Sequence, residues 1–310
     1  MLLSDVRGSG YKRAVRHHWA VLLAGGDGVR LRDLTVRIVG DERPKQFCPL
    51  VGAETLLRQT RSRIDPLFRA DRQVFVVSHA HESYYADELA DAAASKVIAQ
   101  PSNRGTAVAM VVALIEIMRS DPAAVIAFFP CDHHFTDDEL FRSTVSSAVQ
   151  SAEQFPRSLV VVGAEAAYAE TEYGWIEPGR AVTGGGRLCQ VTRFWEKPAL
   201  TQARALFRNA CLWNTFITVG KAATFVELLC SEIPEVVISV TKAIFGKELA
   251  PVYEQLRSVD FSRDILARHA TRLLVLRDSG SGWADLGSPA RVLHLIANNV
   301  IQPGWISAAH

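Results

Sequence analysis

The sequence predicts an α/β fold with a doubly wound sheet, and three observations support this prediction. Apolar runs of roughly five residues alternate with helical patterns through the first half of the chain. These runs are hydrophobic throughout, as expected of central strands that are covered on both faces. After residue 165, strands follow one another directly before helical patterns return, so the sheet is expected to be mixed.

The sequence also predicts where each strand and helix lies. Asp137 stands just before the helical pattern at residues 138–154 and is a candidate N-cap, because its side chain can accept hydrogen bonds from free amide groups of the first turn. The expected strands are residues 19–24, 74–78, 97–99, 124–129, 159–163, 173–177, 188–195, 212–219 and 272–276. The expected helices are residues 54–64, 82–94, 106–118, 138–154, 222–230, 235–244, 252–256 and 289–298.

Size and charge limit the class of protein. The chain has 310 residues, of which 48% are hydrophobic and 22% are charged, which suits one domain with a substantial core. The formal net charge is only +1, so neither nucleic acid nor a membrane is an expected partner. We expect residues 19–310 to form a single domain, because too few residues follow the last predicted helix to build another.

The first 18 residues are expected to form a flexible basic arm. They include Arg7, Lys12 and Arg16, and the apolar run that follows is only six residues long. A secretory signal or a membrane span needs a longer run, and a transit peptide is the alternative. The five cysteines are scattered without metal-ligand spacing, which indicates reduced thiols and a cytoplasmic location.

A glycine-rich turn follows the first strand, and its glycines would let backbone N–H groups approach a phosphate closely. It is not a P-loop, and Leu31 stands where a dinucleotide fingerprint needs its third glycine. The next helix is expected only near residue 54, which also disfavours a dehydrogenase. Arg30 and Lys45 offer the positive charge that a triphosphate needs. A plain glycine turn followed by a solvated loop is the alternative.

The turn and the segment around Lys45 resemble the signature of sugar-phosphate nucleotidyltransferases. Leu23 to Leu31 match L-A-G-G-x-G-x-R-L, and Pro44-Lys45-Gln46-Phe47 has the P-K-Q-F form of mannose-1-phosphate guanylyltransferases. The resemblance covers about residues 19–297. It implies a Rossmann-like, GT-A-like catalytic domain without a C-terminal β-helix. It also implies that the nucleotide phosphates are held by Leu23, Ala24, Gly25, Gly26, Gly28, Arg30 and Lys45.

A second nucleotide-binding segment is expected where the helix at 106–118 begins. A helix N-terminus offers free N–H groups to an anion or a base edge, and Asn103 is a candidate cap. The segment resembles the family's E-P-x-x-R-N-T-A, but Gln100 replaces its glutamate and its Arg-Asn order is altered, so the base stays open. An ordinary strand–turn–helix junction is the alternative. The implied residues are Gln100, Asn103, Arg104, Gly105 and Thr106.

Two aspartates are expected to bind Mg²⁺. Asp132 follows the fourth strand, at the sheet edge that carries the glycine turn, and Mg²⁺ favours one or two carboxylates together with phosphate oxygens. Its segment resembles the family's P-x-D-H, whose aspartate binds the catalytic metal. The segment around Asp285 resembles W-x-D-x-G, which implies the second carboxylate. His133 and His134 lack zinc-site spacing and are expected to be structural or to support the metal ligands.

The sugar phosphate is expected to bind through segments that resemble the family's Y-G-Y-I, F-x-E-K-P and W-N-S-G. For the first two, a turn before a strand and a surface ion pair are the alternatives. Phe216 departs from the glycine of W-N-S-G, which implies a reshaped pocket beside Asn214. Asp260, in a segment that resembles S-x-D-F/Y, is either a sugar-pocket residue or a helix cap. The implied residues are Tyr173, Gly174, Glu196, Lys197, Asn214 and Asp260.

Together the resemblance implies Mg²⁺-assisted, in-line transfer of a nucleotidyl group, GMP from GTP in its most specific form, to mannose 1-phosphate. Arg30 and Lys45 would neutralise the departing pyrophosphate, Asp132 would hold the metal, and Lys197 would hold the sugar phosphate. A nucleoside triphosphate and a sugar 1-phosphate are therefore the expected partners, and a homodimer stays open. The alternatives are another triphosphate, another phosphorylated or phosphonylated acceptor, or a non-catalytic regulatory relative that binds a nucleotide sugar.

Overall fold

The computed structural model describes residues 17–93, 96–182, 184–246, 248–298, 300–301 and 303–307. Its strands are β1 (His18–Leu23), β2 (Gln73–Ser78), β3 (Val97–Gln100), β4 (Val125–Pro130), β5 (His133–His134), β6 (Leu159–Glu165), β7 (Gly174–Ala181), β8 (Leu188–Glu196), β9 (Leu212–Lys221), β10 (Leu273–Arg277) and β11 (Ala284–Asp285). Its helices are α2 (Arg32–Val39), α3 (Leu56–Ile64), α4 (Glu82–Tyr85), α5 (Thr106–Ser120), α6 (Asp138–Gln154), α7 (Leu200–Arg208), α8 (Ala222–Glu232), α9 (Pro234–Gly246), α10 (Leu249–Gln255), α11 (Phe261–Asp264), α12 (Pro289–Ala297) and α13 (Gly304–Ser307).

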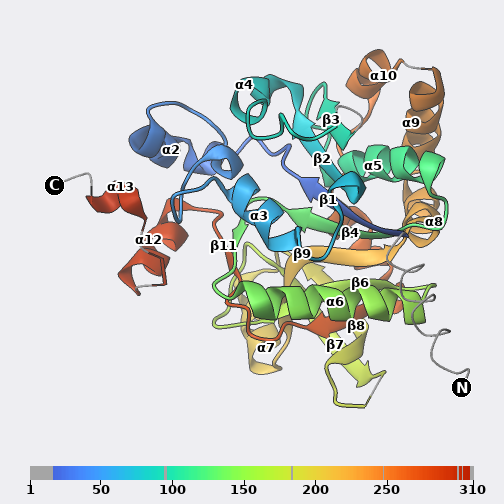
Figure 1. Ribbon diagram of the computed structural model, residues 1–310. Coiled ribbons are helices and arrows are strands. Elements are labelled where there is room, and N and C mark those ends of the chain that lie inside the picture. The colour runs from blue at the N-terminus through green and yellow to red at the C-terminus, as the bar shows by residue number, and fades with distance from the viewer. Residues whose placement is uncertain are drawn as a thin grey trace, which may run out of the picture.

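A mixed sheet forms the middle layer of the molecule (Figure 1). Within the described ranges it has nine strands in the order β3-β2-β1-β4-β9-β6-β10-β8-β7. Strands β3, β2, β1 and β4 are parallel, and β9 lies antiparallel between β4 and β6. Strands β8 and β7 extend the other end as antiparallel partners. The predicted doubly wound, mixed α/β sheet is confirmed.

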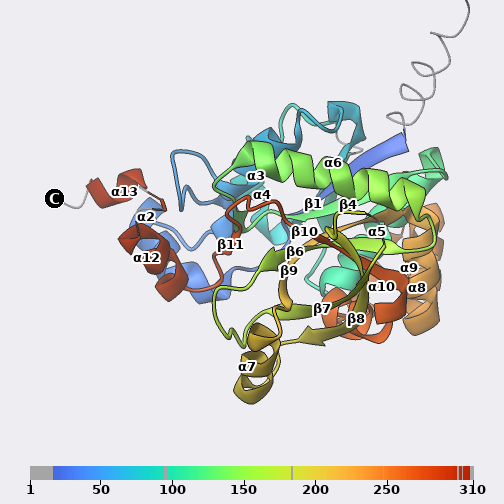
Figure 2. The same cartoon turned by 90° about the horizontal axis from the view of Figure 1, so that it is seen from below.

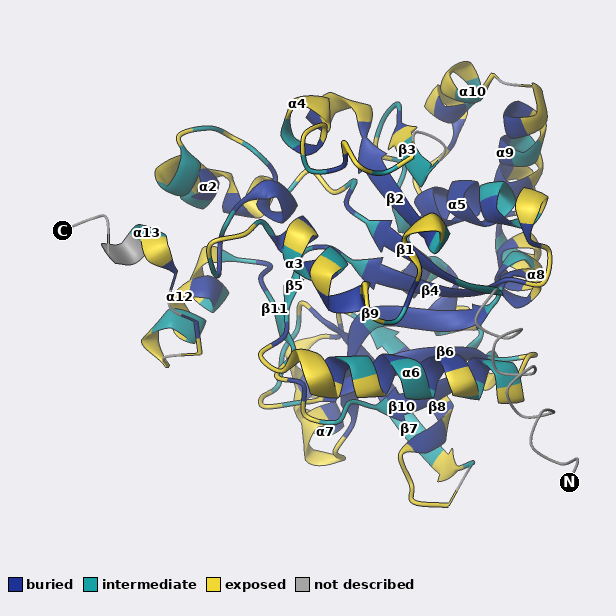
Figure 3. Ribbon diagram, in the orientation of Figure 1, coloured by how far each residue is buried: buried dark blue, intermediate teal, exposed yellow. Residues whose placement is uncertain are grey.

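Helices cover both faces of the sheet, so consecutive residues of its central strands pack into two different hydrophobic cores. In β1, Trp19 and Val21 pack with α5, α8 and α9, whereas Ala20 and Leu22 pack with α3 and α6. Figure 2 shows α6 on one side of the strands and α8 and α9 on the other. The central strands are accordingly buried along their length, and exposed residues lie on the outward faces of the helices (Figure 3). This double burial explains the uninterrupted hydrophobic runs in the sequence.

Several element boundaries agree closely with the sequence. Helix α6 spans the predicted residues 138–154, and the Asp137 side chain caps it by accepting hydrogen bonds from the amides of Glu139 and Leu140. The first strand begins one residue early, at His18, and His17 Nδ1 lies 2.7 Å from Oδ1 of Asp121. The last two residues of the expected basic arm thus belong to the folded part, and residues 1–16 lie outside the described residues.

Three expectations were wrong. Residues 29–39 form a 3₁₀ turn and helix α2 instead of a loop. This short helix buries only Thr35 fully, and its half-buried Leu34 and Ile38 pack against the cluster around Leu31. The helix expected at 82–94 is a single turn, α4, because buried Tyr85 and Leu89 imitate helical spacing while the chain continues as turns. The last residue of the expected helix, Ala94, lies outside the described residues. Helix α7 was not expected at all.

A small hydrophobic cluster fixes the C-terminal region beside the start of the chain. Leu31 and Leu50 pack with Leu286 and with Val292 of α12. This packing brings the segment that carries Asp285 alongside the glycine turn after β1. None of the helices that the structure describes is long and apolar enough to cross a membrane.

Candidate active site

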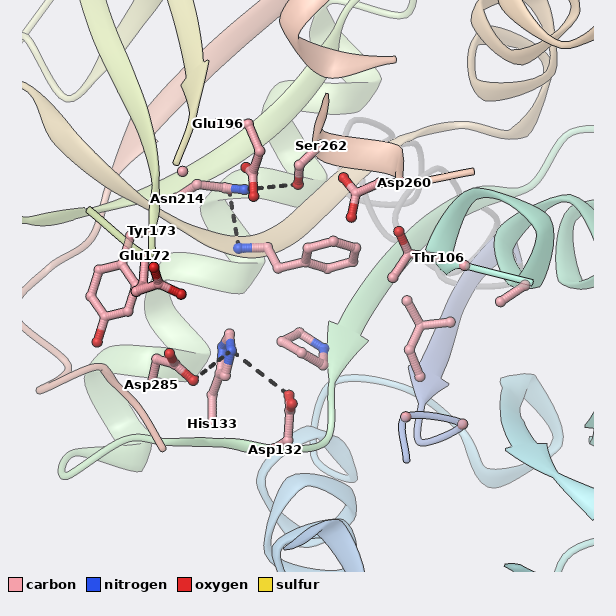
Figure 4. Close-up of a pocket in the computed structure, with 18 of the residues that line it drawn as sticks. Thr106, Asp132, His133, Glu172, Tyr173, Glu196, Asn214, Asp260, Ser262 and Asp285 are labelled. Carbon is pink, nitrogen blue, oxygen red and sulfur yellow. Dashed lines mark hydrogen bonds and ion pairs between the residues drawn. The ribbon is translucent and has the colours of Figure 1, made fainter. Parts of the chain in front are cut away.

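A cleft of about 410 Å³ opens at the carboxyl ends of β1, β3 and β4. It brings together segments from both halves of the chain, with Asp132, His133 and Asp285 at one end and Glu196, Asn214, Asp260 and Ser262 at the other (Figure 4). Most residues of the expected site line it: Leu23, Gly25, Gly26, Arg30, Lys45, Gln100, Asn103, Gly105, Thr106, Asp132, Tyr173, Gly174, Glu196, Lys197, Asn214, Asp260 and Asp285.

Three expected nucleotide-binding residues do not line the cleft. Ala24 is buried, and its backbone bonds to Val76 and to the side chain of Gln46. Gly28 forms the turn behind the cleft with a φ of 61°, a left-handed conformation that favours glycine. Arg104 turns away, because its guanidinium donates to the backbone and side-chain oxygens of Glu254. The structure therefore gives Ala24 and Gly28 a role in shaping the loop, and it leaves Arg104 outside the residues that line the cleft.

The P-K-Q-F segment fastens the glycine turn. The side-chain amide nitrogen of Gln46, Nε2, donates to the backbone carbonyl oxygens of Ala24 and Gly26, at 2.9 and 2.7 Å. These bonds fix the backbone on which phosphate binding would depend. Gln46 belongs to the P-K-Q-F motif, but no role was predicted for it. Its side chain is only 3% exposed in the folded protein, and the sequence alone does not show this burial.

The segment after β3 is held by its own side chains. The side-chain oxygen of Gln100 accepts a hydrogen bond from the hydroxyl of Tyr253 at 2.6 Å. The side-chain nitrogen of Gln100 occupies the space that a Cβ on Gly25 would need. Asn103 donates to Asp27 in the glycine turn and accepts from the amide of Gly105. Helix α5 itself begins after Gly105, so Asn103 ties two loops together and is not the N-cap.

The two aspartates meet through a short antiparallel pair of strands. In this pair Asp285 of β11 lies opposite His133 of β5, the residue after Asp132. Lys45 lies between the carboxylates, with Nζ at 3.2 Å from Oδ2 of Asp132 and 3.6 Å from Oδ1 of Asp285. The same ammonium donates to the carbonyl oxygen of Leu286 at 3.0 Å. A buried cation thus balances two acids that lie far apart in the sequence.

His133 and Trp283 support this acidic pair, although no sequence pattern assigns a role to Trp283. The indole N–H of Trp283 donates to Nδ1 of His133 at 3.1 Å. The other ring nitrogen, Nε2, then carries the proton in a neutral ring and faces Asp132 and Asp285 at 3.7 and 3.8 Å. The expectation that His133 supports the metal ligands therefore agrees with its position.

Asp285 is also held from the other side, by Arg291 of α12. The Arg291 guanidinium lies 2.6 Å from Oδ2 of Asp285 and 2.9 Å from Glu170, and it stacks 4.4 Å above the ring of Tyr173. A Cβ on Gly287 would lie 2.5 Å from Oδ2 of Asp285 and 2.7 Å from Arg291, so the glycine of W-x-D-x-G leaves room for this ion pair. One oxygen of Asp285 is thereby occupied, and the other faces the cleft.

The chemistry of this end fits Mg²⁺. Burial raises the pKa of Asp132, but the charge of the Lys45 ammonium and its hydrogen bond to the carboxylate act against that effect, and the pKa lies below the usual value. Both carboxylates approach one point, which the Lys45 ammonium occupies. Among the described residues no cluster of three or more metal-ligating side chains occurs, so phosphate oxygens and water would have to supply the remaining ligands of an Mg²⁺ ion. Asp132 and Asp285 are the residues that would hold the ion.

The opposite end of the cleft contains Gly174, Glu196, Lys197 and Asp260. A Cβ on Gly174 would lie 2.8 Å from Oε2 of Glu196, so a larger residue there would displace the Glu196 carboxylate. Burial, together with the nearby carboxylate of Asp260, raises the pKa of Glu196 to about 7. Asp260 caps α11 by accepting from the amide of Arg263, as one of the two alternatives expected, and it also lines the cleft. Lys197 lines the cleft with a positive φ of 48°.

Sequence reasoning missed several lining residues. Glu172 pairs with Arg30 across the cleft at 3.4 Å, an exposed contact that no motif announces. Phe216 was noted only as a departure from the family pattern. The others contribute backbone or apolar surface, or are small polar side chains, and lie beside recognised motifs: they are Val76, Ala109, Pro130 and Ser262.

Comparison with known proteins identifies the family. Residues 19–299 match the family described as Nucleotidyl transferase. The xanthan biosynthesis protein XanB of Xanthomonas campestris pv. campestris (strain B100) is 30% identical over 282 residues, which cover 88% of this chain and 58% of XanB. The mannose-1-phosphate guanylyltransferase of Escherichia coli (strain K12) is 28% identical over 287 residues, covering 87% of this chain and 58% of that protein. The chain therefore spans less than two thirds of the length of these relatives.

A solved structure shares the fold. The crystal structure of mannose-1-phosphate geranyltransferase from Thermus thermophilus superposes with a TM-score of 0.78 at 28% identity, and the match covers 87% of this chain and 76% of that one. Since the family match extends over most of the chain and its glycine turn and paired aspartates meet in one cleft, the chain belongs to the nucleotidyl transferase family.

Proposed function

We propose that this domain transfers a nucleotidyl group from a nucleoside triphosphate to a sugar 1-phosphate, with GTP and mannose 1-phosphate as the substrates to test first. The observation that supports this most strongly is the position of Lys45, between Asp132 and Asp285 and next to the glycine turn. Glycine-lined backbone and paired carboxylates in one cleft are what a metal-bound polyphosphate requires. The name of the relative in Escherichia coli, a mannose-1-phosphate guanylyltransferase, agrees with this proposal and suggests its specific form.

In the proposed reaction an oxygen of the sugar phosphate forms a bond to the α-phosphorus of the triphosphate. The bond from that phosphorus to the oxygen of the β-phosphate breaks, and pyrophosphate leaves with the bonding electrons. Bound Mg²⁺ supplies charge neutralisation for the reacting phosphates. No covalent enzyme intermediate is required, so catalysis rests on positioning and electrostatics.

The chain's own residues then have separate tasks. Arg30 and Lys45 neutralise charge that builds up on the departing pyrophosphate. Asp132 and Asp285 hold the metal, with His133 and Arg291 fixing their orientation. Lys197 binds the phosphate of the sugar, at the end of the cleft that also contains Glu196 and Asn214.

The choice of base is the less constrained part of the proposal. Gln100 replaces the family's glutamate, and its side chain is already bonded to Tyr253. A different nucleoside triphosphate, a different phosphorylated acceptor and a non-catalytic regulatory relative therefore remain alternatives. A cytoplasmic location is part of the proposal and rests on the scattered cysteines alone.

A matrix of nucleoside triphosphates against sugar 1-phosphates tests the proposal, with pyrophosphate release measured with Mg²⁺ and with a chelator. We expect Mg²⁺-dependent release that is fastest for GTP with mannose 1-phosphate. Fastest release with another pair would keep the reaction and change its substrates. No release from any pair, combined with binding of a nucleotide sugar, would replace the enzyme with the regulatory alternative.

A further inference from the structure

Strand β9 contains a bulge where it crosses the floor of the cleft. In its pairing with β6, Thr218 lies opposite Val161 and Asn214 lies opposite Gly163, so residues 215–217 of β9 face Val162 alone. The hydroxyl of Thr215 donates to the carbonyl oxygen of Val162 at 2.8 Å and replaces a missing ladder bond. Bulges next to active sites commonly redirect a side chain, and here the redirected residue is Phe216.

Phe216 adopts a conformation that a side chain of its size rarely takes. Its φ is 66°, in the left-handed region that favours glycine. Among the described residues, only Lys197, Ala210 and Phe216 have a positive φ without being glycine, and two of them line the cleft. The side-chain carbonyl of Asn214 accepts from the amide of Phe216 at 3.1 Å and holds the turn in place. Strain of this kind at a functional cleft calls for an explanation in terms of the site.

The Phe216 ring has a fixed position. It meets the ring of Phe261 at a centroid distance of 6.3 Å and an interplanar angle of 61°. The amide of Phe261 in turn donates to the hydroxyl of Thr106, at the start of α5. Phe216 is thus a half-buried wall of the cleft, clamped between β9 and the α5–α11 corner.

The polar groups around this wall suit a ring that carries hydroxyl groups. Asn214, Ser262, Glu196 and Asp260 lie together at this end of the cleft (Figure 4). Amide, hydroxyl and carboxylate groups can exchange hydrogen bonds with hydroxyls, and an aromatic side chain offers apolar surface to the C–H face of a ring. Within the described part of the chain, the side-chain amide nitrogen of Asn214 has only a long contact, 3.4 Å, to Ser262, so it can donate to a ligand.

We propose that Phe216 is a specificity-determining residue that limits the size of the sugar accepted at this end of the cleft. The inference rests on the proposed function, because it names what selects the acceptor of that reaction. A glycine, the residue that the backbone conformation favours, would leave the volume of a benzyl group open beside Asn214. With Phe216 in place, an unsubstituted hexose 1-phosphate fits and an N-acetylhexosamine 1-phosphate is rejected by steric overlap.

Two variants separate the ring from the strain. Both Phe216→Gly and Phe216→Ala remove the ring, but only the glycine variant relieves the positive φ. Phe245→Ala is the matched control, because Phe245 is exposed on α9 and does not line the cleft. Each variant is assayed with mannose 1-phosphate and N-acetylglucosamine 1-phosphate, and the binding of each acceptor alone is measured by calorimetry.

We expect the ratio of kcat/KM for the two acceptors to shift at least about tenfold toward the larger one in both Phe216 variants, within the range typical of steric selection. The KM for the triphosphate should stay within about twofold of the wild-type value in both Phe216 variants. For Phe245→Ala, the ratio of kcat/KM for the two acceptors should also stay within about twofold of wild type. The Tm of Phe216→Gly should exceed that of Phe216→Ala by about 2 °C or more, because only glycine accepts the bulge conformation without strain.

The outcomes distinguish this inference from the proposed function. Normal pyrophosphate release with an unchanged acceptor ratio in both Phe216 variants would overturn the role of Phe216 and leave the reaction intact. Absence of release by the wild type would remove the proposed reaction, and the calorimetric Kd ratio would then decide the role of Phe216. An unchanged Kd ratio, or no binding of either sugar phosphate by the wild type, would overturn the inference.

Discussion

The ammonium nitrogen of Lys45 lies 3.2 Å from a carboxylate oxygen of Asp132, and the lysine is only 7% exposed. A buried lysine next to an acid usually signals a charge balance that other residues depend on. Here the balance includes Asp285, whose carboxylate faces the same ammonium. The pair thus joins the segment that fastens the glycine turn to the segment that follows β4, and a change to either residue should disturb the whole site.

Asp132→Asn should reduce turnover by orders of magnitude and leave the fold intact. The substitution keeps the shape of the side chain but removes the negative charge that would hold Mg²⁺. Pyrophosphate release at saturating Mg²⁺ is the measurement, and Asp71→Asn, at an acid paired with Arg69 on the surface, is the matched control. Near-normal release by the Asp132 variant would exclude this residue from the metal site.

Lys45→Ala should lower kcat/KM for the triphosphate and destabilise the protein without metal. Loss of the cation leaves two carboxylates facing each other, at a cost of roughly 2 kcal/mol, below that of a fully buried pair because Asp132 is 37% exposed. Added Mg²⁺ should then raise the Tm of the variant more than that of the wild type, because the ion replaces the lost charge. Equal Mg²⁺ effects on both proteins would argue that the carboxylates do not share a cation.

Arg291→Lys should weaken the support that the site receives from the C-terminal region. A lysine cannot bridge Asp285 and Glu170 while also stacking on Tyr173. We expect about a tenfold loss in kcat and a higher Mg²⁺ concentration for half-maximal rate, as for other residues that orient metal ligands. Arg69→Lys serves as the surface control. A normal Mg²⁺ dependence in the Arg291 variant would show that Asp285 needs no such support.

Glu196→Gln should change how stability depends on pH. The folded-state pKa of Glu196 is raised from 4.5 to about 7. Between these values the folded protein holds a proton that the unfolded chain has lost, so the free energy of unfolding falls as pH rises through this window. Glutamine removes the effect, so the Tm of the variant should exceed that of the wild type at pH 8 and approach it near pH 4.5.

The control for this pH series is Glu139→Gln, at an exposed position on α6. Its Tm difference from the wild type should not grow across the same window. A constant Tm difference for Glu196→Gln would mean that Glu196 stays ionised at neutral pH, as an exposed acid would.

The sheet and the main site segments could be predicted because their signals are local. Hydrophobic runs revealed β1, β2 and β4 because burial on both faces leaves no polar position. Glycine and charge patterns singled out Lys45 and Asp132, and the structure brings both into one cleft. The convergence of Asp132 with Asp285 could be expected only from the resemblance to a family.

Other features depend on contacts between distant parts of the chain, which a single sequence does not encode in any visible pattern. Arg291 acts through a 2.6 Å ion pair to Asp285, yet in the sequence it is one arginine among many. Arg104 matched a motif, but Glu254 draws it away from the cleft. Helix α2 was not predicted because it is short, and its apolar residues Leu34 and Ile38 are only half-buried against the small cluster around Leu31 and Leu286.

A double-mutant cycle on Asp132 and Asp285 tests the central claim most directly. Pyrophosphate release is measured for the wild type, Asp132→Asn, Asp285→Asn and the double variant at the same Mg²⁺ concentration. If both carboxylates serve one metal-bound polyphosphate, the double variant should be about as slow as the slower single variant, because either change alone already disables the shared site. Losses that multiply in the double variant would contradict the claim, because they would mean that the two aspartates act independently.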